Sequence, residues 1–119
     1  MANKIFSWDC ETNGLWGQAF AIGAVIYEDG REVKTFYARC PIEGQVDSWV
    51  EANVLPQMVD MSQTHDSYNE MLKAFAEFFL ENKADADVIF HMGVPVEARV
   101  ILDMHDKGFI GNEYIEKFV

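Results

Sequence analysis

The sequence has few basic residues, few cysteines and few prolines, and each scarcity excludes a class of protein. Nine Lys and Arg stand against 20 Asp and Glu, a formal net charge of −11. This balance excludes a polybasic binder that neutralises phosphates with its own side chains. The two cysteines, Cys10 and Cys40, have no CxxC spacing, so neither a zinc site nor a disulfide framework is indicated. With only three prolines and no low-complexity tract, the chain does not have the composition of a disordered protein.

Long hydrophobic runs are also missing. The longest uncharged segment, Thr12 to Tyr27, is shorter than the roughly 20 apolar residues of a spanning helix and is interrupted by Gly14, Gly17 and Gly23. Residues Met1 to Ser7 lack the apolar segment and small-residue cleavage site of a secretory signal. We therefore expect a cytoplasmic protein without a membrane span.

The chain nevertheless contains enough apolar material for a hydrophobic core. Half of its 119 residues are hydrophobic, and these include 9 Phe, 4 Tyr and 3 Trp. Since domains hold roughly 100–200 residues, the length predicts a single domain.

The first forty residues have the pattern of three β-strands. Lys4–Asp9 is short and bulky, and Gln18–Tyr27 is an apolar run followed by Asp29 and Gly30, a pair favoured in hairpin turns. Arg31–Arg39 alternates in polarity, which predicts a strand with one wetter face. These segments predict a three-stranded antiparallel meander.

The rest of the chain changes to helical spacing and then alternates between helix and strand. Ser67 and Glu70 have the spacing of a capping box, which predicts that the main helix begins at Tyr68. This order predicts an α/β fold with helices on the faces of a mixed sheet. The predicted elements are a weak helix over Asp47–Val54, the helix from Tyr68, a buried strand over Val88–Met92, and a helix from Pro95 to near Gly108.

The segment Ser7–Leu15 (SWDCETNGL) places two acids at the end of the first strand. Asp9 and Glu11 are two residues apart, so strand alternation puts both carboxylates on one face, while Trp8 and Cys10 point into the core. Two adjacent carboxylates repel each other, and Mg²⁺ or Mn²⁺ are natural compensating charges. The alternative is that both acids are merely solvated at the strand end.

The string DCETNGL resembles the first motif, D-x-E-T-x-G-L, of the DEDD superfamily of 3′-to-5′ exonucleases, which have a ribonuclease H-like fold. The order of strands and helices is also similar to that of the family. The resemblance implies that Asp9 and Glu11 ligate two catalytic Mg²⁺ or Mn²⁺ ions. It further implies that the following residues line the pocket for the 3′-terminal nucleotide: Thr12, Asn13, Gly14 and Leu15. Trp16 is a candidate to stack on the terminal base, the alternative being that it packs within the loop.

The segment HMGVPVE resembles the second motif of the family, in which an acid follows a strand. The resemblance makes Glu97 the third catalytic and metal-ligating residue, with Asp103 as the fallback ligand. The segment departs from the usual pattern, because Met92 replaces Asn, Glu replaces Asp and the spacing from His91 is one residue longer. The alternatives are that Glu97 is a helix-capping surface acid and that His91 is a packed histidine rather than a catalytic base.

The third motif of the family has no counterpart in the sequence. It is an Asp preceded by His five residues earlier or by Tyr four residues earlier, whereas His105 is followed by Ile110 and Tyr114 by Phe118 at those spacings. We therefore expect one exonuclease-like domain, residues 1–119, that lacks the last strand and helix of the fold. A sheet without its last strand has an unpaired edge that invites homodimerisation.

Together these features predict a metal-dependent 3′-to-5′ exonuclease that hydrolyses single-stranded DNA or RNA ends by a two-metal mechanism. Divalent ions reconcile this substrate with the acidic composition, since they offset the local carboxylates. One alternative is an incomplete, non-catalytic module that binds a nucleotide or a protein partner. A second is a structural domain in which the motif is a coincidence.

Overall fold

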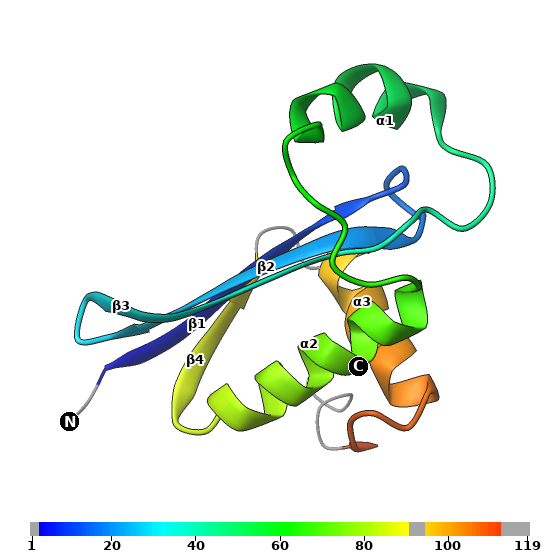
Figure 1. Cartoon of the computed structure of the whole chain (residues 1–119). Helices are drawn as coiled ribbons and strands as arrows, with labels where there is room; N and C mark the ends of the chain where they lie inside the picture. The colour runs from blue at the N-terminus through cyan, green and yellow to red at the C-terminus, as the bar shows by residue number, and fades with distance from the viewer. Residues whose placement is uncertain (1–2, 91–94, 113–119) are drawn as a thin grey trace.

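The computed structural model describes residues 3–90 and 95–112, which form a small α/β fold around a four-stranded mixed sheet (Figure 1). The strand order is β3-β2-β1-β4, with β1, β2 and β3 antiparallel and β4 parallel to β1. The elements in chain order are β1 (Lys4–Thr12), β2 (Ala19–Glu28), β3 (Arg31–Arg39), α1 (Ser48–Asn53), the short 3₁₀ helix η1 (Leu55–Met58), α2 (Tyr68–Asn82), β4 (Ala86–Phe90) and α3 (Val96–Asp106).

The predicted meander is confirmed, and its turn has the expected chemistry. Asp29 and Gly30 adopt φ of 52° and 81°, the positive values that a two-residue hairpin turn of this kind requires. The first strand runs three residues further than predicted and ends at Thr12, next to a register shift between Glu11 and Thr12. The two acids therefore lie inside β1, just before this irregularity.

One face of the sheet carries the hydrophobic core. Phe6 and Trp8 of β1 are buried against α2, where the Phe75 ring lies 6.3 and 4.9 Å from theirs, measured between centroids. The third helix packs against β1 on the same side, as Figure 1 shows. Burial of these aromatic rings stabilises the fold.

The N-terminus of α2 is capped nearly as predicted. The Ser67 side chain accepts a hydrogen bond from the Glu70 amide at 3.1 Å, and the helix begins at Tyr68. The Glu70 carboxylate accepts from the Asp66 amide rather than from that of Ser67, so the return hydrogen bond is displaced by one residue. The bond to Ser67 satisfies one of the amide groups that a helix start leaves without intrahelical partners, and the bond to Glu70 ties the residue before the cap to the first turn.

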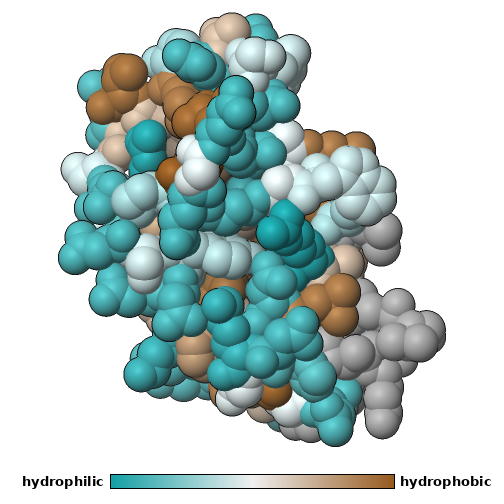
Figure 2. Space-filling view, turned by 90° about the vertical axis from the view of Figure 1, so that its right-hand side faces the viewer, coloured by the Kyte–Doolittle hydropathy of each residue, from teal (hydrophilic) through white to brown (hydrophobic). Residues whose placement is uncertain are grey.

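The opposite face of the sheet is open over much of its area. Asp9, Thr35 and Tyr37 are exposed there, and Val25 is half-buried. In Figure 1, α1 lies above one end of this face, on the other side of the sheet from α2 and α3. Figure 2 shows the molecule from the right-hand side of Figure 1; this side is mostly hydrophilic, with hydrophobic side chains at the top, where α1 lies, and others scattered below. The sheet thus has one packed face and one accessible face.

The strand β4 begins two residues earlier than predicted, at Ala86, and is described as far as Phe90. The predicted end at Met92 lies outside the described residues. The prediction that this strand is buried is wrong, because Val88 and Ile89 are exposed. The strand lies at an edge of the four-stranded sheet, next to β1 alone among the described strands. No helix within 3–90 and 95–112 is long and apolar enough to cross a membrane.

Candidate active site

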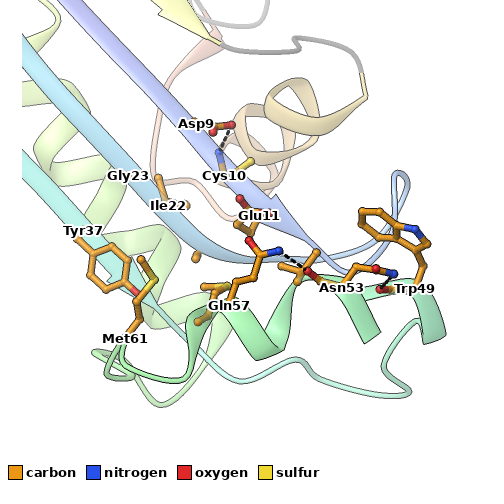
Figure 3. A pocket seen from close by; sticks show the side chains of 13 residues that line it. Asp9, Cys10, Glu11, Ile22, Gly23, Tyr37, Trp49, Asn53, Gln57 and Met61 are labelled. Carbon is orange, nitrogen blue, oxygen red and sulfur yellow. Dashed lines mark hydrogen bonds between the residues drawn. The ribbon is translucent and has the colours of Figure 1, made fainter. Parts of the chain in front are cut away.

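The carboxyl end of β1 presents Asp9 and Glu11 together on the open face of the sheet. Both acids are exposed, whereas Trp8 and Cys10 between and beside them are buried, as strand alternation predicts. One oxygen of Asp9 accepts a hydrogen bond from the Cys10 amide at 2.8 Å. In Figure 3 the Cys10 side chain points toward α3 while Glu11 faces the cavity.

The two acids interact unfavourably. Desolvation, and after it the negative charge of Asp9, raises the pKa of Glu11 above its ordinary value. Both causes disfavour the ionised form of Glu11. A divalent cation bound between the carboxylates would reverse this effect, and carboxylate oxygens are the ligands that Mg²⁺ and Mn²⁺ prefer.

Glu97 approaches the acids from α3, on the side of β1 to which Cys10 points. It lies in the first turn of that helix and has no exposed surface, so the alternative that it is a surface acid is wrong. The Cys10 thiol donates to Glu97 Oε2 at 3.6 Å. Burial and the charge of Glu97 raise the pKa of Cys10, which keeps the thiol protonated and able to donate.

Asp9, Glu11 and Glu97 line one cavity of about 560 Å³. Its other walls come from the loop after β1, from α1 and from the start of α3. Within the described part of the chain, however, no three His, Cys, Asp or Glu side chains stand close enough to hold one metal ion together. The structure therefore brings the three predicted acids to one cavity without gathering them around a single point.

The loop that follows the acids is held in a defined shape. Gly14 adopts φ of +80°, and a Cβ at this position would lie 3.3 Å from a carboxylate oxygen of Asp47. The Asn13 side chain donates to the Gln45 carbonyl at 2.9 Å and accepts from the Asp47 amide at 2.6 Å. Since Asp47 also caps α1, the loop and α1 are tied together.

The predicted substrate-binding residues lie on this loop, and they differ in exposure. Thr12, Asn13 and Gly14 are half-buried, whereas Leu15 is 51% and Trp16 72% exposed. The alternative that Trp16 packs within the loop is therefore wrong. Its indole is available for stacking, while its carbonyl oxygen accepts a hydrogen bond from Arg99 Nη1 at 2.5 Å.

Asp103, the fallback ligand, is occupied elsewhere. Its carboxylate accepts from the Tyr68 hydroxyl at 2.5 Å and pairs with Arg99 at 3.4 Å. Burial and the neighbouring carboxylate of Asp103 raise the pKa of Tyr68, so its hydroxyl remains a donor. These contacts connect α2, α3 and the Trp16 loop, and Asp103 is one of the residues that make this connection.

Sequence reasoning missed Arg99 as part of this connection, although a signal was present. Arg99 and Asp103 have the i, i+4 spacing at which opposite charges meet on a helix. The contact of Arg99 with the Trp16 carbonyl spans 83 residues, and no local pattern predicts it. His91 lies outside the described residues.

The candidate site thus consists of two exposed acids on one strand, a buried acid on a helix and a braced loop with an exposed indole. Comparisons of the chain with protein-family models, with curated proteins and with solved structures found no match.

Proposed function

We propose that this protein is a divalent-metal-dependent 3′-to-5′ exonuclease that acts on single-stranded DNA or RNA ends. The observation that carries the proposal is the placement of Asp9 and Glu11 side by side on an open sheet face, at a cavity that Glu97 also lines. The succession of three antiparallel strands, helices, a strand and a helix supports the ribonuclease H-like fold that the DEDD resemblance implies.

In this proposal Asp9, Glu11 and Glu97 hold Mg²⁺ or Mn²⁺, two ions being expected. When bound, such ions polarise the scissile phosphate and generate a nucleophilic hydroxide at neutral pH. The exposed positions of Asp9 and Glu11 leave room for a phosphate to approach them. The chain's own acids cannot bind that phosphate directly, because like charges repel.

The loop after β1 supplies recognition of the terminal nucleotide. Thr12, Gly14 and Leu15 line the cavity beside the acids, and the Asn13 side chain braces the loop. Leu15 and Trp16 offer exposed apolar surface to the base. Stacking on an aromatic ring tolerates any base, which suits an enzyme that removes nucleotides in sequence. The contact of Arg99 with the Trp16 carbonyl holds this part of the loop near α3.

A second candidate is a non-catalytic module that binds a nucleotide or a protein partner. It is favoured by one observation: no group of three potential metal ligands comes together within residues 3–90 and 95–112. Metal binding without cleavage would support this candidate.

The test is digestion of 5′-labelled single-stranded DNA and RNA in Mn²⁺ or in EDTA. We expect a ladder shortened from the 3′ end in Mn²⁺ only. Asp9→Asn preserves the size of the side chain and should lower the rate at least 100-fold, in the range seen when electrostatic stabilisation is lost. Asp87→Asn, a change at an exposed acid of β4, is the matched charge control and should cleave like the parent. Equal cleavage by the Asp9 variant would refute the site.

A further inference from the structure

Gly23, in the middle of β2, is a glycine that neither the backbone nor the packing requires. Its φ is not positive, and a Cβ added to it would meet no atom within 4 Å. The register shifts of β2 lie elsewhere, so Gly23 does not mark a bulge. A glycine inside a strand weakens it and often marks a place where a ligand approaches the backbone closely.

Gly23 lies directly between the candidate metal site and an exposed aromatic ring. In the sheet register it pairs with Asp9 on one side and with Tyr37 on the other. Tyr37 is 41% exposed, so its ring is accessible from the open face. The missing side chain leaves a flat floor between the carboxylate of Asp9 and the phenol ring.

This floor is part of a cavity of about 430 Å³, here called the Gly23 groove. Figure 3 shows the helical segment α1–η1 along it, with Trp49 at one end and Tyr37 and Met61 at the other. The volume is within the range of small-molecule sites. The groove adjoins the cavity that Glu97 lines, and the two acids lie where the two spaces meet. The residues common to both linings are Asp9, Cys10, Glu11, Trp49 and Val54.

The lining of the Gly23 groove suits an uncharged nucleoside rather than a phosphate. Among the described residues that line it there is no Lys or Arg, and the charged ones are Asp9 and Glu11. The side-chain nitrogens of Asn53 and Gln57 donate to carbonyls of the same segment, at 3.0 and 3.1 Å. Their amide oxygens accept no hydrogen bond among the described residues and can accept one from a base edge.

We propose that the Gly23 groove binds the nucleoside on the 5′ side of the scissile phosphate, with its sugar over Gly23 and its base against Tyr37. This inference rests on the proposed exonuclease function, in which the loop Thr12–Trp16 takes the terminal nucleotide and Asp9 and Glu11 face the phosphate. The preceding nucleoside then lies on the other side of the acids, and that is where the groove is.

The test compares two substrates that differ only on the 5′ side of the scissile phosphate. The dinucleotide pTpT fills both spaces, whereas the p-nitrophenyl ester of thymidine 5′-phosphate has a nitrophenyl group in place of the preceding nucleoside. Gly23→Val builds a side chain into the groove and should raise the ratio of KM for pTpT to KM for the ester at least tenfold. Gly23→Ala should give a smaller rise in the same ratio.

Val25→Ile is the matched control, since Val25 lies on the same strand and face but outside the groove. Its KM ratio should equal that of the parent. Gly23→Val should also melt no lower than the parent, because a β-branched residue is favoured in a strand and nothing obstructs it. An unchanged KM ratio in a folded Gly23→Val protein would overturn the groove assignment.

Failure of the exonuclease proposal can be distinguished from failure of the groove assignment. If the parent hydrolyses neither substrate, that proposal fails, and the groove is then judged by equilibrium dialysis of pTpT in Mn²⁺. Binding by the parent that Gly23→Val weakens at least tenfold supports the groove as a nucleoside site. Equal binding by the two proteins, or no binding by either, overturns it.

Discussion

The two faces of the sheet are built from the same strands but differ in burial and charge. On the packed face, Phe6 and Trp8 of β1 meet the aromatic rings of α2 and are almost completely buried. On the open face, the alternating residues of the same strand are the mutually repelling acids Asp9 and Glu11. The comparison teaches that one face supplies stability, whereas the other holds a repulsion that costs stability.

The largest expected effect comes from damage to the packed face. Phe75→Ala removes a ring that contacts Phe6, Trp8, Phe36 and Phe79. Loss of a fully buried Phe should lower the free energy of unfolding by about 3–5 kcal/mol. Urea denaturation followed by circular dichroism measures this change. A loss below about 1 kcal/mol would show that α2 does not pack on the sheet as described.

An intermediate effect is expected where α2 and α3 brace the Trp16 loop. Tyr68→Phe deletes the hydroxyl that donates to Asp103 at 2.5 Å, and hydrogen bonds to charged groups contribute about 1.5–3 kcal/mol. We expect that loss in the free energy of unfolding. With exonuclease activity in hand, KM for single-stranded substrate should rise more than kcat falls. Tyr27→Phe, on β2, is the control. A purely structural role would leave KM unchanged.

The smallest expected effect comes from the open face, and there a substitution should stabilise the protein rather than destabilise it. Glu11 has a raised pKa, so its ionised form is disfavoured in the folded state, and Glu11→Gln relieves that cost at pH 7. For this exposed position we expect about 0.5 kcal/mol, or roughly 2–4 °C in Tm.

The pH dependence of this gain has a definite sign. As the pH falls through the raised folded pKa and then the ordinary value of 4.5, Glu11 becomes protonated in both states. The difference in Tm between parent and Glu11→Gln should therefore vanish below pH 4.5. Melting curves at several pH values measure it, with Glu51→Gln as the control. A variant that is less stable than the parent at pH 7 would contradict the repulsion between the acids.

The sequence predicts the elements and the strand acids because both follow from local periodicity. The three strands, the capped start of α2 and the shared face of Asp9 and Glu11 all depend on residues within a few positions of one another. The burial of Glu97 does not depend on neighbouring residues, since it results from the packing of α3 against Cys10, 87 residues away.

For the same reason, the Gly23 groove could not be predicted from the residues near Gly23 in the sequence. Asp9, Gly23 and Tyr37 become neighbours only through strand pairing, and α1–η1 covers them from a fourth segment of the chain. A mid-strand glycine was visible in the sequence as an interruption of an apolar run. Its meaning depends on what lies above it in the folded protein.

The central claim is that Asp9 and Glu11 hold a divalent cation. Electron paramagnetic resonance of Mn²⁺ titrated into the protein tests it directly, because bound Mn²⁺ loses the sharp spectrum of the free ion. We predict saturable binding to the parent that Asp9→Asn weakens at least tenfold and that Asp87→Asn leaves unchanged. Equal Mn²⁺ binding by parent and Asp9→Asn, or none by either, would contradict the account.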